Sequence, residues 1–305
     1  MVLLWSAALF TKNIAGAIQK NKRIIHQKNR IVKVSNSDKG IIIAIGGNEE
    51  KGLYNKELDY SSVLGNFVLQ TEFKSKSKIL IIPSASAHQE EASKNYQNAF
   101  AKLGCVYVET LFINAREEAD SQKNIDALNS SHAIIFTGGD QSKIVSAFSG
   151  TEFLRRLKQK HRLEKYVIAG TSAGSMAMSG SMIAGGVIDT NTLFKGSVRY
   201  GEGLSFLSDI IIDTHFIKRG RFGRLVEAVS LNKEKIGIGV AEDTAIVIKK
   251  RKLFVIGTGM VIIFDPKKTK GGVKSNHSIS GMRVHVLSSG DRFCIKKRKV
   301  FFNAE

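Results

Sequence analysis

Apolar and polar residues form blocks along the chain that predict strands and helices in turn. Six short apolar runs are typical of buried strands: Ile41–Ile45, Lys78–Pro83, Val106–Phe112, Ala133–Thr137, Tyr166–Ala169 and Ile210–Asp213. Between them lie stretches that favour helices, at Ser62–Phe73, His88–Leu103, Ser121–Asn129, Gln141–Gln159 and Phe222–Leu231. This alternation predicts an α/β fold with a doubly wound, mainly parallel sheet covered by helices on both faces.

Beyond Gly237 the pattern becomes β-rich. The predicted strands there are Ala245–Ile248, Leu253–Ile256, Met260–Phe264, Arg283–Leu287 and Val300–Phe302. Glycines and the Asp265–Pro266 pair between these runs are typical of hairpin turns. Because no linker precedes this part, we expect a β-rich C-terminal extension of a single domain, residues 38–305, preceded by a basic tail, residues 1–37.

The strongest candidate for chemistry is Ser172, which lies in a Gly-x-Ser-x-Gly turn after the run Tyr166–Ala169. A tight turn from strand to helix needs residues without a bulky Cβ on either side of the serine, and Gly170 and Gly174 fit that need. Such a turn exposes the serine hydroxyl and points the next backbone N–H, that of Ala173, toward a developing oxyanion. An ordinary turn between strand and helix is the alternative.

A nucleophilic serine needs a histidine as its base. Of the seven histidines, His26, His88, His161 and His277 lie among polar residues, and His132 and His285 lie in or beside apolar runs. His215 differs because it follows a buried strand and shares one strand face with Asp213, two residues earlier. Burying both side chains without hydrogen-bond partners would cost on the order of several kcal/mol, which favours a shared polar site over a position in the core.

A carboxylate that orients the histidine would complete the arrangement. Glu242 and Asp243 lie together between two apolar runs, and their spacing does not decide between them. The chain order of serine, histidine and acid excludes an α/β-hydrolase, in which the acid precedes the histidine.

Two Gly-Gly pairs, Gly46–Gly47 and Gly138–Gly139, also follow predicted strands. Neither shows the GxGxxG spacing of a dinucleotide-binding turn, and the chain has no GxxxxGK[ST] motif. We interpret both pairs as turns at the carboxyl ends of parallel strands, the edge where open α/β sheets bind ligands.

Six motifs in order resemble the family of serine peptidases that includes cyanophycinase and dipeptidase E. They are Gly46–Lys51, Phe136–Gln141, Gly170–Gly174, Asp213–Phe216, Arg219–Leu225 and Gly239–Ala245, and the C-terminal run Ser280–Leu287 with Gly290–Phe293 is also similar. The likeness covers roughly residues 40 to 295 and the motifs are jointly specific. It implies a fold like that of class I glutamine amidotransferases, which is flavodoxin-like.

The resemblance also implies roles for individual residues. Ser172 would be the nucleophile, His215 the general base and Glu242 the group that orients His215. Backbone N–H groups of Ala173 and of Gly138–Gly139 would form the oxyanion hole. The substrate pocket would contain Gln141, Asp213, Thr214, Arg219, Arg221 and Arg224.

The substrate implied is cyanophycin, a polyaspartate backbone whose β-carboxyls carry arginine, cut to β-aspartyl-arginine dipeptides through an acyl-enzyme. Arginine side chains would receive its carboxylates, and an acid such as Asp213 its guanidinium groups. Cyanophycinases typically carry glutamine where this chain has Thr214, which puts the fit of the substrate in doubt. From spacing alone, Arg219, Arg221 and Arg224 do not share one helical face, so a solvated helix start is the alternative for them.

The net charge of +19 is the feature that an enzyme of this kind explains least. Residues 1–37 contain seven Lys and Arg and no acid, and basic runs occur at Lys249–Lys252 and Lys296–Lys299. A basic nucleic-acid-binding protein without catalysis is therefore a rival class. Lysine runs in hairpin turns are ordinarily solvated, and interleaved aromatic residues are missing, so we favour the enzyme. An aspartyl or isoaspartyl dipeptidase like dipeptidase E is the closer alternative.

Cysteine content and the N-terminus complete the picture. The two cysteines, Cys105 and Cys294, are expected to be free thiols, which fits a reducing compartment. The chain lacks a Cys/His cluster with zinc spacing, and we expect neither metal nor cofactor. The apolar run Val2–Phe10 is too short to span a bilayer. We predict a cytoplasmic protein, and the resemblance implies a homodimer.

Overall fold

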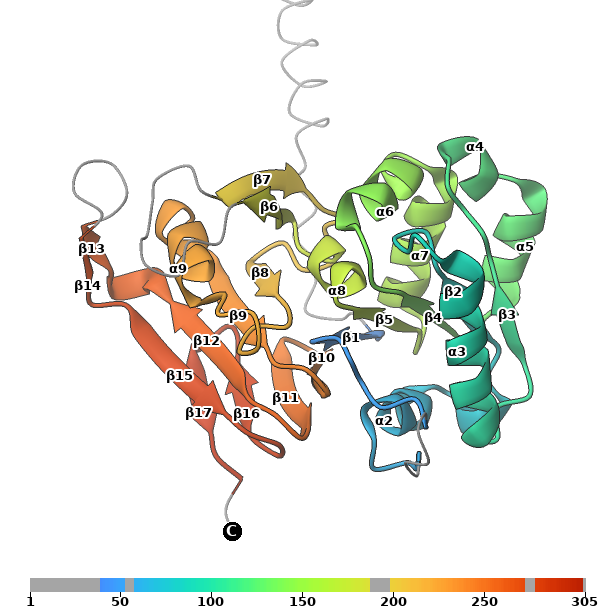
Figure 1. Ribbon diagram of the computed structural model, residues 1–305, viewed down its shortest axis with the longest axis horizontal. Helices are drawn as coiled ribbons and strands as arrows, with labels where there is room; N and C mark the ends of the chain where they lie inside the picture. Colours follow the sequence, from blue (N-terminus) through green and yellow to red (C-terminus); the bar gives the residue numbers. More distant parts are fainter. Residues whose placement is uncertain (1–38, 53–57, 187–197, 272–277, 304–305) are drawn as a thin grey trace, which may run out of the picture. The chain divides into compact units, whose positions relative to one another are not determined.

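The computed structural model describes residues 39–52, 58–186, 198–271 and 278–303, and its largest sheet has nine strands (Figure 1). Five strands run parallel, in the order β1 (Ile41–Ile45), β5 (Val167–Thr171), β4 (Ala133–Phe136), β2 (Ile79–Ile82) and β3 (Val108–Thr110). Four antiparallel strands continue the sheet beyond β1: β10 (Thr244–Lys249), β11 (Lys252–Gly257), β16 (Arg292–Cys294) and β17 (Lys299–Phe301). The predicted α/β fold with a β-rich C-terminal part is confirmed.

Strand β1 shows why helices cover both faces of this sheet. Its alternate residues Ile41, Ile43 and Ile45 belong to one buried cluster, with side chains of α2 (Val63–Gln70) and α3 (Gln89–Lys102). Its remaining residues belong to a second cluster, with side chains of α4 (Arg116–Ala119), α5 (Gln122–Ser130), α6 (Gln141–Phe148), α7 (Glu152–Leu163) and α8 (Ala173–Ala177). Because successive strand residues point to opposite faces, a continuous apolar run marks a strand that is buried on both sides.

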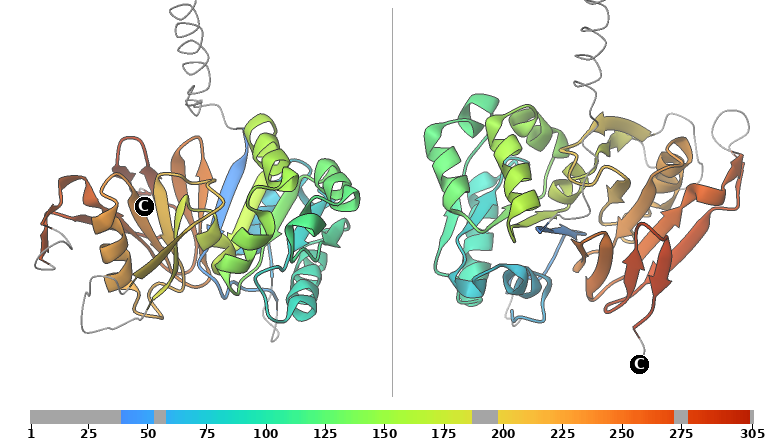
Figure 2. Two further views of the ribbon diagram at one scale, coloured as in Figure 1. Left: turned by 90° about the horizontal axis from the view of Figure 1, so that it is seen from above. Right: turned by 180° about the vertical axis from the view of Figure 1, so that it is seen from behind.

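A second sheet of four strands lies beside the first (Figures 1 and 2). Its order is β15 (Arg283–Leu287), β12 (Val261–Asp265), β9 (Ile236–Val240) and β8 (Ile210–Asp213). Helix α9 (Phe222–Leu231) connects β8 to its parallel neighbour β9 and packs on this sheet through Leu225 and Val229. Helix α9 packs so closely on β9 that a Cβ at Gly237 would lie 2.6 Å from Val229 Cγ1.

The run Ile210–Asp213 was predicted as a strand of the parallel sheet, and this placement is wrong. It forms β8 at the edge of the second sheet, because it pairs only with β9, whose hydrogen bonds on the other side go to β12. The apolar run reveals a buried strand but not its neighbour.

Element boundaries differ from the prediction in several places. The predicted helix Gln141–Gln159 is two helices, because Gly150 adopts a φ of +80° and Thr151 caps α7 by accepting a hydrogen bond from Leu154 N at 3.2 Å. The predicted strand Val106–Phe112 is reduced to three residues. Elements that the pattern did not reveal are the hairpin of β6 (Ser181–Gly186) and β7 (Val198–Glu202), the pair β13 (Lys270–Gly271) and β14 (Ile279–Ser280), strand β16, helix α4, and the short helices η1 (Lys74–Lys76) and η2 (Pro266–Lys268).

The two basic runs form neighbouring turns, one between β10 and β11 and one between β16 and β17. They lie side by side, since Ile295 N donates to Arg251 O at 3.1 Å. Their lysines are exposed, as predicted, whereas Arg251 and Arg298 pair with Asp209 and Asp265.

The predicted tail, residues 1–37, lies outside the described residues, so the division into a tail and a domain of residues 38–305 stays a prediction. Within the described ranges, no helix is both long and apolar enough to cross a membrane.

Candidate active site

Ser172 lies between the last residue of β5 and the first residue of α8, in a strained conformation with φ +50° and ψ −113°. A non-glycine residue here costs about 1–3 kcal/mol, and such strain clusters at functional sites. The backbone holds it in place because Ser172 N donates to Ile45 O, at the end of β1, at 3.0 Å.

The two glycines beside Ser172 are required by close packing. A Cβ at Gly170 would lie 2.4 Å from the carbonyl carbon of Gly174, and a Cβ at Gly174 would lie 2.2 Å from Phe136 O. Neither glycine has a positive φ; that conformation belongs to the serine itself. The expectation that these positions exclude a bulky Cβ is confirmed.

His215 is brought to Ser172 by the chain that follows β8. Its Nε2 lies 2.9 Å from Ser172 Oγ, and its Nδ1 lies 2.7 Å from Glu242 Oε1. The residue adopts a φ of +48°, and its N–H donates to Gly46 O at 2.8 Å. Gly47 packs on the ring so closely that a Cβ there would lie 2.5 Å from Nε2. The first Gly-Gly turn therefore supports the imidazole.

The structure selects Glu242 over its neighbour Asp243. Glu242 Oε2 accepts hydrogen bonds from Lys218 Nζ at 3.0 Å and Asn48 Nδ2 at 3.3 Å, while Oε1 faces the imidazole. Asp243 instead accepts from Glu50 N at 3.1 Å and the Thr258 hydroxyl at 2.9 Å. Asp243 thus fixes the surrounding loops.

Burial and hydrogen bonds together set the protonation of the pair. Desolvation lowers the pKa of His215 below its ordinary value, with a further lowering by the charge of Arg219, and these effects outweigh the hydrogen bond that His215 donates to Glu242. Desolvation would raise the pKa of Glu242, but its hydrogen bonds with His215 and Lys218 lower it below the ordinary range. Near neutral pH the imidazole is therefore neutral, with one nitrogen free to accept a proton from a hydroxyl, and the carboxylate is ionised.

Asp213 is fully buried beside His215 and joins two of the predicted arginines. Arg224 Nε donates to Asp213 Oδ2 at 2.6 Å, and Arg224 Nη2 also donates to Oδ1. Arg221 Nη1 lies 3.2 Å from Oδ1 and 2.8 Å from the carbonyl oxygen of Thr214. The expectation that Asp213 receives a substrate guanidinium does not match this arrangement, because the chain's own arginines already occupy both carboxylate oxygens.

The remaining predicted pocket residues are dispersed. Gln141, the first residue of α6, donates through Nε2 to Ile183 O on β6 at 2.8 Å. Thr214 is fully buried, and its hydroxyl has no hydrogen-bond partner within the part of the chain that the structure describes. Arg219 is exposed, close enough to affect the pKa values of His215 and Arg221. Desolvation lowers the pKa of Arg221 to about 10, and the guanidinium remains charged.

The Gly138–Gly139 turn borders Ser172. A Cβ at Gly138 would lie 3.3 Å from Ser172 Cβ, and one at Gly139, where φ is +137°, would lie 1.9 Å from Ala85 O. Ala173 begins α8, and the first N–H groups of a helix lack partners within it. Ala173 therefore lies next to Ser172 in the chain, and the Gly138–Gly139 turn lies next to it in space. Both are candidates for the oxyanion hole.

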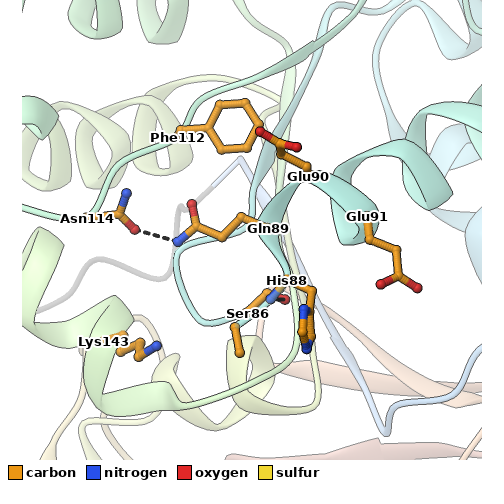
Figure 3. Close-up of a pocket in the computed structure, with 9 residues that line it drawn as sticks. Ser86, His88, Gln89, Glu90, Glu91, Phe112, Asn114 and Lys143 are labelled. Atoms are coloured by element: carbon orange, nitrogen blue, oxygen red, sulfur yellow. Dashed lines mark hydrogen bonds between the residues drawn. The ribbon is translucent and has the colours of Figure 1, made fainter.

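A polar cavity of about 720 Å³ lies beyond this turn (Figure 3). Its lining comes from the chain after β2, the start of α3, the chain after β3 and the start of α6: Ser86, Ala87, His88, Gln89, Glu90, Glu91, Phe112, Asn114 and Lys143. The side-chain amides of Gln89 and Asn114 are hydrogen-bonded across it. The cavity opens at the carboxyl edge of the parallel sheet.

Asn48 and Lys218 are contacts of Glu242 that the sequence did not reveal. Asn48 lies inside a motif that carried the family resemblance, so that motif was the available signal; Lys218, exposed and three residues after His215, gave none. In the described ranges, no three His, Cys, Asp or Glu side chains come together to bind a metal ion.

The fold, together with a serine, a histidine and a glutamate linked by hydrogen bonds, defines the class of this protein, a serine-type peptidase. A model of peptidase family S51 matches residues 41–256, and the chain belongs to that family. The chain is 33% identical over 287 residues to a cyanophycinase from Trichormus variabilis, covering 90% of this chain and 92% of that protein. It is 30% identical over 273 residues to a cyanophycinase from Synechococcus elongatus, covering 86% and 81%.

A solved structure supports the fold independently. The crystal structure of a peptidase from an acI-B1 Actinobacterium superposes with a TM-score of 0.61 at 19% identity, covering 84% of this chain and 96% of that one.

Proposed function

We propose that this protein is a cyanophycinase, a serine exopeptidase that releases β-aspartyl-arginine dipeptides from cyanophycin. The observation that carries the proposal is the pair of contacts at His215, 2.9 Å to Ser172 Oγ and 2.7 Å to Glu242 Oε1. Relatives named cyanophycinase that match over most of the chain supply the substrate.

In the proposed reaction, Ser172 Oγ attacks the carbonyl carbon of a backbone peptide bond while His215 Nε2 accepts the hydroxyl proton. Glu242 holds the Nδ1–H and stabilises the imidazolium. The oxyanion accepts hydrogen bonds from the N–H of Ala173 and from the Gly138–Gly139 turn. His215 then protonates the leaving amine, and water hydrolyses the acyl-enzyme by the same path with His215 as base.

The substrate's carboxylates fit the arginines beside the catalytic histidine. Asp213 neutralises only one of the two charges of Arg221 and Arg224, so the cluster keeps a net positive charge next to Ser172. Because Asp213 binds both guanidinium groups, it orients them toward a carboxylate ligand, which arginine binds through two parallel N–H groups. Arg219, exposed nearby, adds a third cation. Gln141, which donates to Ile183 O, stays a proposed substrate contact on the family resemblance alone.

Substrate guanidinium groups need a different acceptor than Asp213. The cavity beyond the Gly138–Gly139 turn offers the exposed carboxylates of Glu90 and Glu91. Thr214 is buried, so we assign it no contact with substrate. Cyanophycinases typically carry glutamine at this position. This chain therefore lacks that amide, and the buried Thr214 hydroxyl does not replace it in the substrate pocket.

Two further parts of the proposal concern the cellular location and the oligomeric state. A cytoplasmic location is in keeping with Cys105 and Cys294, which are free thiols. A homodimer is carried by the family resemblance alone, and size-exclusion chromatography with light scattering would test it.

The test is release of β-aspartyl-arginine from purified cyanophycin by the wild-type protein, with Ser172→Ala as control. We expect dipeptide release by the wild type and a loss of about 10⁶-fold in kcat in the variant. Cleavage of aspartyl or isoaspartyl dipeptides with cyanophycin untouched would favour a dipeptidase. Binding of nucleic acid without any hydrolysis would favour the non-catalytic class, and a loss below tenfold in Ser172→Ala would refute the mechanism.

A further inference from the structure

The motif Gly46–Lys51, which follows β1, carries part of the family resemblance, but none of its side chains takes part in a step of the proposed reaction. In the fold this segment lies against all three residues of the Ser–His–Glu arrangement. Ile45 O, immediately before it, accepts the N–H of Ser172 at 3.0 Å, and Gly46 O accepts the N–H of His215 at 2.8 Å. Asn48 Nδ2 donates to Glu242 Oε2 at 3.3 Å. A displacement of this segment would therefore move the whole arrangement.

The anchor of this segment is the carboxylate of Glu49, whose side chain is fully buried. Its Oε2 accepts a hydrogen bond from Thr171 Oγ1 at 2.7 Å. Its Oε1 accepts the hydroxyl of Tyr96, on α3, and lies 3.1 Å from Lys51 Nζ. Glu49, the residue after Asn48, thus connects the residue before Ser172 with helix α3.

The charges around Glu49 keep it ionised although it is buried. Desolvation would raise its pKa, but the charge of Lys51 and the hydrogen bonds from Tyr96 and Thr171 hold it below the ordinary value. Burial and the charge of Glu49 raise the pKa of Tyr96 well above its ordinary range, so the phenol stays a donor. A buried carboxylate with three donors fixes its partners firmly, since each donor left without an acceptor would cost about 1–3 kcal/mol.

We propose that Glu49 is a positioning residue for the peptidase reaction, holding the Ser172 turn through Thr171 and the Glu242 carboxylate through Asn48. The inference rests on the proposed role of Ser172 as nucleophile. Glu49 touches neither substrate nor the reacting atoms. Its effect is geometric: it keeps the strained Ser172 backbone and the supports of His215 in register, and a misplacement of about 1 Å can cost about 100-fold in rate.

The test measures how fast a fluorophosphonate probe reacts with Ser172, per folded molecule, across pH. In Glu49→Ala we expect the plateau rate to fall about 100-fold. In Glu49→Gln we expect a smaller loss, about tenfold, because the amide oxygen can still accept the Thr171 hydroxyl but no longer pairs with Lys51. The pH of half-maximal rate should stay close to its wild-type value in both, since neither substitution removes a group that contacts the His215 imidazole.

Thr171→Val provides a second, independent route, because it removes the same hydrogen bond with little change in shape. We expect a loss of about tenfold, and adding Thr171→Val to Glu49→Ala should cause little further loss, as expected for two residues that act through one contact. The matched control is Asp265→Asn, which neutralises another fully buried carboxylate in the second sheet. Its labelling rate per folded molecule should equal that of the wild type.

Equal labelling of the wild type and Glu49→Ala would overturn the inference, as would fully additive losses in the double variant or a shift of the acid limb with an unchanged plateau. The probe does not depend on cyanophycin. A wild type that reacts at Ser172 but leaves cyanophycin intact would therefore refute the proposed substrate and not the role of Glu49.

Discussion

Two strands of the second sheet end in the same way and do different things. Asp213 ends β8 and Asp265 ends β12; both are fully buried, and each carboxylate binds two arginines. At Asp213 the next residues carry the chain to His215, which faces Ser172 across 2.9 Å. At Asp265 the next residue is Pro266, and the carboxylate caps the short helix η2 by accepting Lys267 N at 3.1 Å. A buried aspartate with two arginines is therefore no sign of a site by itself.

The surroundings of the arginines make the difference. Beside Asp265, Arg298 also donates a hydrogen bond to Glu234 O at 2.8 Å, and it stabilises the packing of the C-terminal strands. Arg221 lies close enough to His215 for its charge to lower the pKa of the imidazole, and Arg224 binds the same carboxylate as Arg221. We expect changes at Asp213 to lower activity per folded molecule, and changes at Asp265 to lower stability with activity per folded molecule kept.

The largest expected effect concerns Glu242 and Asp243, the two acids that follow β9. Glu242→Gln should lower kcat by about 10⁴-fold, because an amide no longer fixes the tautomer of His215 or stabilises its cation. Its neighbour Asp243 provides the matched control: Asp243→Asn should cost at most about tenfold, since that carboxylate holds Glu50 N and the Thr258 hydroxyl. Dipeptide release under saturating cyanophycin measures both, and equal losses in the two variants would contradict the assignment.

Asp213→Asn should raise KM, with kcat/KM falling about 100-fold, because the uncharged amide no longer orients two guanidinium groups. Steady-state kinetics on soluble cyanophycin fragments, scaled to the folded fraction, measures the effect. If KM is unchanged and only the unfolding midpoint falls, Asp213 is a scaffold residue like Asp265.

Asp265→Asn should lower the free energy of unfolding by about 3 kcal/mol, because it removes a fully buried carboxylate that is the counter-charge of two half-buried guanidinium groups. Urea denaturation followed by circular dichroism reports this loss. The kcat of the fraction that remains folded should match the wild type; a loss of kcat without a loss of stability would erase the contrast between the two regions.

The smallest predicted effect is on the pH profile. The base must be neutral, and the pKa of His215 lies below its ordinary value of about 6.5. Activity should be full above that value and fall about tenfold per pH unit only once the pH drops through the lowered pKa, as the imidazole takes up a proton. A profile of kcat/KM between pH 4 and 8 measures this, and an acid limb centred above 6.5 would disagree.

Much of the site was predictable because its parts are local. The Gly-x-Ser-x-Gly turn encodes its own geometry, the place of His215 after a buried strand singled it out among the histidines, and the family motifs implied Glu242. Partners that depend on the approach of distant segments were not predictable: Asn48 and Glu242 are 194 positions apart, and spacing alone left Glu242 and Asp243 equivalent. The same limit applies to Ile210–Asp213, whose burial was evident but whose sheet was not.

The central claim is that Ser172 is the nucleophile, activated by His215 and Glu242, and covalent labelling tests it most directly. Mass spectrometry of the intact chain after fluorophosphonate treatment, followed by peptide mapping, should show one adduct per chain, located on Ser172. The adduct should be absent from Ser172→Ala and form orders of magnitude more slowly in His215→Ala. Stoichiometric labelling of Ser172→Ala, or equally rapid labelling of His215→Ala, would contradict the account.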